Sequence, residues 1–248
     1  MSNEKAQARF SQYVKQHKQY FGEKLAGPML EYGCGAGQFL ITAHAAGIAC
    51  HGVEVEQARA AQFRANVAAQ GRDHLNDYFK LYDGVILPYS SKYFNVTYSW
   101  FVLEHVHDIW TSLREIVRVT KVGGAISLAT QDARNCYDGH CDTPWPLLLP
   151  AHLVKAYLEE FGHEESYIDY MCKEVFYVTT PLIASTLKAL NCEIIYQSAD
   201  PTPTCLDSIN IRTADQAKAY ARKVKTLIDH GQWARPMENA IVYARRLS

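Results

Sequence analysis

Short apolar runs alternate with amphipathic stretches along most of the chain, and this pattern predicts strands connected by helices. Apolar runs bounded by turn residues predict seven strands, at residues 28–32, 48–55, 78–82, 94–102, 124–130, 193–198 and 240–246. Apolar residues at helical spacing predict helices at residues 5–20 and 109–119. Further helices are predicted at residues 38–46 and 57–70, which end at Gly47 and Gly71, and at residues 151–161, 181–190 and 214–231. Such alternation is typical of a doubly wound α/β domain, with a mostly parallel seven-stranded sheet covered by helices on both faces.

The alternation stops after the fifth strand, between residues 131 and 180. This stretch mixes aromatic and polar residues and contains one clear helical pattern before the regular order resumes. We therefore expect a helical insertion, residues 131–180, that covers the active site at the carboxyl edge of the sheet. Residues 1–26 predict an N-terminal helical extension, and the whole chain, 1–248, is expected to form a single domain.

Composition narrows the function classes. The chain has 25 basic and 26 acidic residues and a net charge of −1, so a basic surface that tracks nucleic-acid phosphates is disfavoured. No apolar run is long enough to span a bilayer, and the first ten residues lack the apolar core of a signal peptide. Seven cysteines without a disulfide framework fit a reducing compartment, so we expect a cytoplasmic protein.

The strongest motif is a glycine-rich turn after the first strand, Leu30-Glu31-Tyr32-Gly33-Cys34-Gly35-Ala36-Gly37. Glycines let the backbone approach a ligand closely. The spacing is G-x-G-x-G, whereas the dinucleotide fingerprint is G-x-G-x-x-G. Glu31, two positions before the first glycine, would repel a pyrophosphate but suits an ammonium group. The turn therefore favours a zwitterionic cofactor without phosphate.

Acidic residues follow the next two strands. Glu54 lies 17 residues after Gly37, where a carboxylate can accept both hydroxyls of a ribose. Glu56 is the nearby competitor for this role. Asp83-Gly84 ends the third strand, and a carboxylate there can accept a hydrogen bond from an adenine amino group.

Together with Ser99-Trp100-Phe101-Val102-Leu103-Glu104-His105-Val106 and Lys121-Val122-Gly123-Gly124, these motifs resemble the small-molecule branch of the class I S-adenosylmethionine (SAM)-dependent methyltransferases over about residues 27–130. The resemblance implies SAM as cofactor. It places Glu31 and the glycine backbone at the amino-acid end of SAM, Glu54 at the ribose and Asp83 at the adenine. The full set of expected cofactor contacts is Glu31, Gly33, Cys34, Gly35, Gly37, Glu54, Val55, Asp83, Gly84, Ser99 and Phe101. Tyr32, Asn95 and Val122 depart from the residues usual in the family.

The insertion resembles a region of methyltransferases that modify bacterial surface sugars or the sugars of secondary metabolites. The residues that carry this likeness are Asn135, His140, Trp145-Pro146, Leu149-Pro150 and Tyr157. It implies a small-molecule or sugar-like acceptor, methylated at a hydroxyl oxygen.

A hydroxyl acceptor must lose its proton, and histidine is the natural base near neutral pH. We expect His140, in the polar insertion, to be the first candidate and His105 the second; His107 and His152 lie in nearby segments. Tyr137 and Trp145 are candidates for shaping the acceptor pocket.

Cysteines near His140 are candidate ligands for a metal ion. Cys136, Cys141 and Cys172 do not match the spacing of a structural zinc site, so no metal is expected.

Two other function classes stay open at this point. One is a SAM-binding partner or regulatory protein without catalytic activity, and the other is an NAD-dependent oxidoreductase. The missing third glycine and Glu31 count against the oxidoreductase. A homodimer is also compatible with the sequence.

Overall fold

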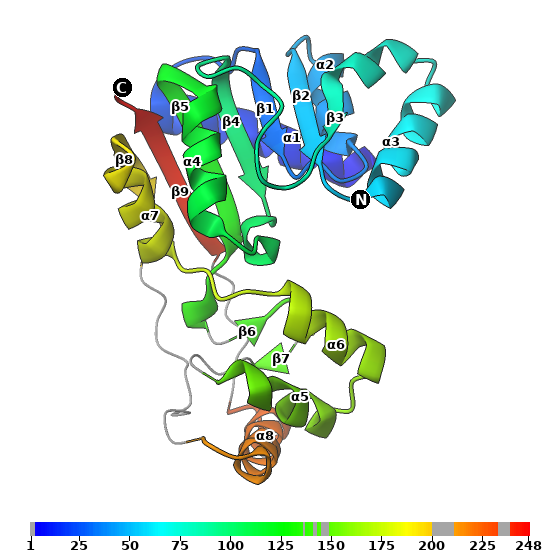
Figure 1. Cartoon of the computed structure of the whole chain (residues 1–248), viewed down its shortest axis with the longest axis vertical. Coiled ribbons are helices and arrows are strands. Elements are labelled where there is room, and N and C mark those ends of the chain that lie inside the picture. The colour runs from blue at the N-terminus through cyan, green and yellow to red at the C-terminus, as the bar shows by residue number, and fades with distance from the viewer. Residues whose placement is uncertain (1–2, 136, 141–142, 145–148, 200–210, 233–238) are drawn as a thin grey trace.

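Seven strands form one sheet, which lies in the upper half of Figure 1. The computed structural model describes residues 3–135, 137–140, 143–144, 149–199, 211–232 and 239–248. The strands are β1 (Met29–Tyr32), β2 (Cys50–Glu54), β3 (Phe79–Leu81), β4 (Phe94–Trp100), β5 (Thr120–Gln131), β8 (Cys192–Gln197) and β9 (Asn239–Arg246). Their order is β3-β2-β1-β4-β5-β9-β8. The first five strands are parallel, and β9 runs antiparallel to both its neighbours. The predicted fold class is therefore confirmed.

Helices cover both faces of the sheet because the strands are apolar on both sides. One face carries α1 (Asn3–Phe21), α2 (Gln38–Ala45) and α3 (Gln57–Ala69), and the other carries α4 (Ile109–Val119) and α7 (Thr180–Ala189). Alternation along β1 divides its side chains between the two cores. Met29 joins the core under α1, whereas Leu30 and Tyr32 join the core under α4. The same alternation turns Glu31 toward α1.

The fifth strand begins four residues earlier than predicted. β5 pairs with β4 from Thr120, but its register shifts before Ala125, so residues 121–124 form a bulge. Gly124 is required there because a Cβ would lie 2.8 Å from the carbonyl oxygen of Lys121 and 2.9 Å from that of Asn95. The glycine pair that sequence analysis placed at the strand start thus lies within the strand.

The insertion forms a second layer beyond the sheet edge (Figure 1). It contains β6 (Tyr137–Asp138) and β7 (Thr143–Pro144), which pair as a small hairpin, and α5 (Ala151–Glu160) and α6 (Glu165–Glu174). Helix α8 (Ala214–Asp229) packs on α5, where Ala217 and Ala221 share a core with Tyr157. A helix between β8 and β9 would cover the sheet in a regular doubly wound fold, so α8 departs from the predicted alternation.

Three short 3₁₀ turns, α6 and the β6–β7 hairpin were not predicted. The turns are η1 (Asp73–Tyr78), η2 (Leu103–His105) and η3 (Ala133–Asn135). They are too short to show a hydrophobic period. Among the helices that the structure describes, none has the length and apolar character needed to cross a membrane.

Tyr13 is one of several α1 side chains that pack on the sheet, and it gives a stability prediction. Tyr13 is 2% exposed, its ring lies 4.4 Å from that of Tyr98, and its hydroxyl donates to Ser127 Oγ at 3.1 Å. We expect Tyr13→Ala to lower the free energy of unfolding by about 3–5 kcal/mol, as for other buried aromatic truncations. Denaturant unfolding measures this change.

The matched control is the next residue, Val14, which is 36% exposed. Val14→Ala should change the free energy of unfolding by only about 0.5 kcal/mol. Equal effects of the two substitutions would contradict the packing of α1 described here.

Candidate functional site

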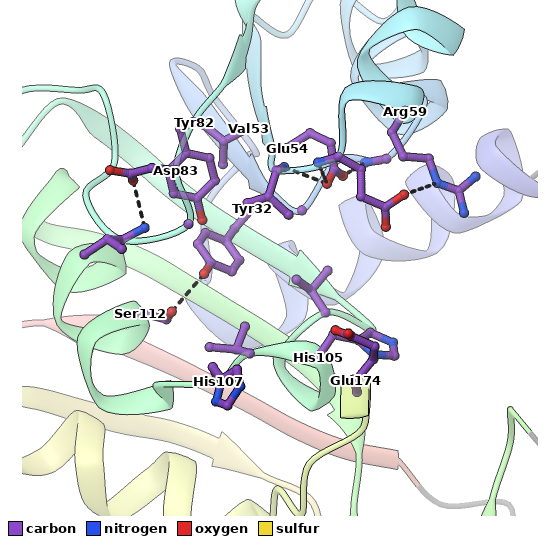
Figure 2. A pocket seen from close by; sticks show the side chains of 18 of the residues that line it. Tyr32, Val53, Glu54, Arg59, Tyr82, Asp83, His105, His107, Ser112 and Glu174 are labelled. Carbon is purple, nitrogen blue, oxygen red and sulfur yellow. Dashed lines mark hydrogen bonds and ion pairs between the residues drawn. The ribbon is translucent and has the colours of Figure 1, made fainter. Parts of the chain in front are cut away.

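Two hollows meet at the carboxyl ends of the parallel strands, along the glycine turn after β1. The larger has a volume of about 680 Å³ and extends over the loops after β2, β3 and β4 (Figure 2). The smaller has a volume of about 500 Å³ and lies toward α1 and the start of α2. Gly33, Gly35, Arg59 and Phe101 line both. An extended ligand that crosses the glycine turn would therefore occupy both hollows.

The glycine turn leaves open space for a ligand at one position. Gly33 and Gly35 have φ angles of 71° and 54°. A Cβ on Gly33 would lie 2.4 Å from a methyl carbon of Val102, so this glycine is required by packing. A Cβ on Gly35 would meet no atom of the described residues within 4 Å. The space beside Gly35 is therefore open to the hollows, and packing in the protein core does not require a glycine at this position.

Glu54 ties the loop after β1 to the loop after β2. Its carboxylate accepts hydrogen bonds from the backbone N–H of Gly35 at 2.8 Å, of Val55 at 2.7 Å and of Glu56 at 3.1 Å. A carboxylate has about four acceptor positions, so capacity remains for a ligand hydroxyl. Glu54 is buried, whereas the side chain of Glu56 is 63% exposed and lies beside Arg59. The buried, anchored carboxylate is the one that sequence analysis preferred.

A buried ion pair closes the far end of the smaller hollow. Arg9 Nη2 of α1 donates to Glu31 Oε1 at 2.7 Å, and Glu31 is 3% exposed. Burial raises the pKa of Glu31 to about 7, with Arg9 opposing the rise. Glu31 Oε2 and Arg9 Nε are buried and have no hydrogen-bond partner in the part of the chain that the structure describes. A zwitterion has one positive and one negative end. The atoms of Glu31 and Arg9 that lack a partner are suited to bind these two ends.

One end of the larger hollow is formed by the loop after β3. Asp83 Oδ1 accepts from the backbone N–H of Val85 at 2.9 Å and of Ile86 at 3.2 Å, and these bonds lower the pKa of Asp83. Gly84 and Val55 also line this end. Val55, Val85 and Ile86 are each more than half exposed. A polar edge beside exposed apolar side chains is suited to a flat heteroaromatic ring.

Tyrosines form the floor of the larger hollow (Figure 2). The hydroxyl of Tyr32 donates to Ser112 Oγ at 2.9 Å, and the ring of Tyr82 lies 6.5 Å from that of Tyr32, edge to face. Tyr32, which departs from the family pattern, therefore has a structural partner on α4.

The remaining predicted cofactor residues differ in position. Phe101 lines both hollows and has a φ of 54°, an uncommon conformation for a residue other than glycine. Cys34 lines the smaller hollow. Ser99 and Gly37 line neither. Ser99 is fully buried and donates to the carbonyl oxygen of Tyr32 at 3.2 Å, and Gly37 precedes α2 against the ring of Phe63.

The two predicted catalytic histidines are in contact. His105 Nε2 lies 3.2 Å from His140 Nε2. His105 lines the larger hollow, and its Nδ1 lies 2.8 Å from the carbonyl oxygen of Glu174. His140 Nδ1 lies 3.1 Å from Asp138 Oδ1, whose hydrogen bond raises the pKa of His140. The two predicted catalytic histidines, His140 and His105, therefore form one pair.

Glu104, the residue before His105, forms a cluster with the two histidines. It is 2% exposed, and burial raises the pKa of its carboxyl. Glu104 Oε2 accepts from the hydroxyl of Thr130, and the backbone carbonyl of Glu104 accepts from the N–H of Phe176 at 2.7 Å. The turn after β4 is thereby tied to the segment after α6.

Other predicted residues lie apart from this cluster or outside the described residues. His107 lines the larger hollow and packs against Phe176, whereas His152 is exposed on α5. Tyr137 is buried away from the larger hollow. Trp145, Cys136 and Cys141 fall outside the residues that the structure describes.

Sequence reasoning missed Arg9, Glu104 and Tyr170. Arg9 precedes Tyr13 by four residues, so it lies on the apolar face of α1. A cation on the apolar face of a helix indicates a buried partner and could have been recognised in the sequence. Tyr170, on the unpredicted helix α6, lines the larger hollow, with its ring 6.1 Å from that of His105.

The sheet order, with its antiparallel β9, is that of the Rossmann-like methyltransferase fold. Residues 30–128 match the methyltransferase domain family. The chain thus contains a SAM-dependent methyltransferase domain, and SAM is its cofactor.

Solved structures share this fold over nearly the whole chain. A SAM-dependent methyltransferase from Mesorhizobium loti is 19% identical, with a TM-score of 0.57, and the match covers 93% of this chain and 96% of that one. Geranyl diphosphate C-methyltransferase from Streptomyces coelicolor A3(2) is 14% identical, with a TM-score of 0.56, covering 95% and 78%. The [4+2]-cyclase SpnF is 20% identical, with a TM-score of 0.57, covering 95% and 80%. At these identities the likeness is one of fold.

Proposed function

We propose that the chain transfers the methyl group of SAM to a hydroxyl oxygen of a small, sugar-like acceptor that binds under the insertion. The observation that carries the proposal is the contact between His105 and His140 beside the larger hollow. An oxygen acceptor needs a group that helps its proton to leave, and this pair lies where the sheet edge meets the insertion.

The residues around the glycine turn fit SAM. We assign Glu31 to the ammonium group and Arg9 to the carboxylate group of its amino-acid end, because both carry unused buried atoms. Glu54 and Val55 are assigned to the ribose, and Asp83 with Gly84 to the adenine. SAM supplies a methyl carbon that its sulfonium already activates for displacement.

The acceptor side combines aromatic and polar groups. His105, His107, Tyr170 and Glu174 line the larger hollow, and the last two come from α6 of the insertion. Such a mixture suits a hydroxylated molecule with apolar faces. Residues 131–180 would then act as a cover that orients the acceptor and excludes water from the reacting methyl group, and orientation alone supplies about 7–11 kcal/mol in favourable cases.

The reaction forms an oxygen–carbon bond as the carbon–sulfur bond breaks, and the electron pair of that bond goes to sulfur. The hydroxyl proton must leave the acceptor, and we assign its removal to the histidine pair. Asp138 supports the pair because it accepts a hydrogen bond from His140 and favours positive charge on that ring.

The first prediction tests where the cofactor binds. Gly35→Val should abolish SAM binding, because its side chain would project into the space that the turn leaves open. Calorimetry with SAM and S-adenosylhomocysteine measures the loss. NAD should not bind the wild-type protein.

Gly47 provides the control, since its φ is +79° and a Cβ there also meets nothing within 4 Å among the described residues, yet it lies outside both hollows. Gly47→Val carries a similar backbone strain of about 1–2 kcal/mol and should retain affinity for SAM. Wild-type affinity in Gly35→Val would reject this placement of the cofactor.

The second prediction tests Arg9. Arg9→Ala should weaken S-adenosylhomocysteine by about 10- to 100-fold, from the loss of about 1.5–3 kcal/mol of charged hydrogen bonding. Methylthioadenosine lacks the amino-acid end, so its affinity should be the same in the variant and the wild type. Calorimetry with both ligands separates the two cases.

If both ligands lose affinity equally in Arg9→Ala, the residue supports the fold and does not contact the cofactor's carboxylate. The methylthioadenosine measurement also reports whether the variant has folded, because that ligand depends on the rest of the site.

The third prediction concerns the histidine pair. His140→Ala should lower turnover by about 10²–10⁴-fold, the range for loss of acid–base assistance, while affinity for SAM stays unchanged. A screen of hydroxylated acceptors with radiolabelled SAM identifies the substrate, and turnover is then compared between the two proteins. A decrease under about threefold would make His140 a bystander.

A further inference from the structure

Three side chains with metal-binding atoms converge where the turn after β4 meets the β6–β7 hairpin. One carboxylate oxygen of Glu104 and one ring nitrogen each of His105 and His140 lie within 4.8 Å of one another. Glu104 and His105 come from η2, whereas His140 comes from the turn between β6 and β7. Among the residues that the structure describes, the cluster contains no cysteine.

The hydrogen bonds of the two rings determine where their lone pairs point. A carbonyl oxygen only accepts, so His105 Nδ1 carries a hydrogen and donates it to Glu174. His140 Nδ1 donates in the same way to the carboxylate of Asp138, which also accepts from the backbone N–H of His140 at 2.7 Å. In the neutral rings both Nε2 atoms therefore carry a lone pair and no hydrogen.

Two unprotonated nitrogens this close repel each other unless a proton or a metal ion lies between them. The Nε2 atoms are 3.2 Å apart. Two nitrogens bound to one ion at about 2.1 Å, with an angle of about 90–110° between them, are about 3.0–3.4 Å apart. The observed separation thus equals that of two adjacent ligands on one ion. The second hydrogen bond of each ring, to a carboxylate or a backbone carbonyl, is also the usual support of metal-binding histidine.

Glu104 provides an independent observation. Its side chain is 2% exposed, and its Oε1 is buried without a hydrogen-bond partner in the described ranges of the chain. A buried carboxylate oxygen with no partner is costly unless a ligand satisfies it. Its other oxygen is held by Thr130, so the carboxylate is anchored beside the two rings.

We propose that Glu104, His105 and His140 bind one divalent transition-metal ion, and that the ion holds the acceptor hydroxyl on its open side. Two imidazoles and one carboxylate form a ligand set that suits ions such as Mn²⁺, Fe²⁺, Co²⁺ or Zn²⁺, and three protein ligands leave positions free. His105 lines the larger hollow, so the free positions are adjacent to the acceptor side. The role toward the acceptor rests on the proposed function, whereas the ion site does not.

The ion changes how the hydroxyl proton leaves. Nε2 atoms bound to the ion are ligands and cannot also take a proton, so in the ion-bound protein the ion replaces the histidine pair in promoting loss of the hydroxyl proton. A hydroxyl on the ion has a lowered pKa, as bound water has, and loses its proton to solvent before methyl transfer. The oxygen anion then attacks the methyl carbon, and the carbon–sulfur electron pair goes to sulfur. No oxidation or reduction occurs.

The test uses Co²⁺ because its visible absorption changes when histidine nitrogens bind it. Full-length protein is treated with a chelator, freed of it, and titrated with CoCl₂. We expect one Co²⁺ per chain with a visible absorption band. His105→Ala, His140→Ala and Glu104→Gln should each lower Co²⁺ affinity by at least about 10- to 100-fold, since loss of a supporting group alone has that effect.

His74→Ala is the control for adventitious binding by histidine, because His74 is exposed on η1, away from the cluster. Its Co²⁺ affinity should equal that of the wild type. Affinity for S-adenosylhomocysteine, measured on every variant, should be unchanged and shows that each has folded.

Absence of the Co²⁺ band in the wild type, or unchanged Co²⁺ affinity in any of the three ligand variants, would overturn the ion site. Then the contact between the rings is a shared proton, and the proposed function stands with the histidine pair as base. If the wild type fails to bind S-adenosylhomocysteine, the proposed function fails, and the Co²⁺ titration still decides the ion site.

Discussion

A charged group buried at the end of a strand is the constraint around which one side of this molecule is organised. Alternation along β1 turns Glu31 toward α1, where it is 3% exposed. An unpaired carboxylate in that position would be strongly unfavourable, so a cation is needed. Arg9 provides it at 2.7 Å, and its guanidinium also lies 4.7 Å from the centre of the Phe39 ring. The pair fixes the position of α1 on the sheet and leaves two opposite charges beside the glycine turn.

Much of the sheet could be predicted because its signals are local. Each strand is an apolar run between turn residues, and α4 shows a clear 3.6-residue period of apolar side chains. The loop residues Glu54 and Asp83 were found for a related reason. In a parallel sheet all carboxyl ends meet at one edge, so position in the sequence is enough to place such residues near a common site.

The parts that escaped prediction depend on contacts between distant segments. The sequence pattern predicts that α8 is a crossover helix on the sheet. Its small residues Ala217 and Ala221 instead pack against Tyr157 of α5, 60 or more residues earlier in the chain. Arg9 and Glu31 were each visible, but only the tertiary packing of α1 shows that they pair. The contact between His105 and His140 is of the same kind, because the hairpin that carries His140 is too short to leave a pattern.

The fold alone does not decide the reaction, since a cyclase and a C-methyltransferase share it with this chain. We therefore expect the residues that determine the reaction of this chain to lie where the insertion meets the sheet edge. There the insertion supplies Asp138 and the carbonyl of Glu174, and these two acceptors fix the hydrogens on both imidazole rings. The sheet alone would present His105 as a single ring on a short turn. With the insertion in place, one nitrogen of each ring and one oxygen of the buried Glu104 carboxylate lie within 4.8 Å of one another. The chemistry open to the site therefore depends on the segment that interrupts the regular fold.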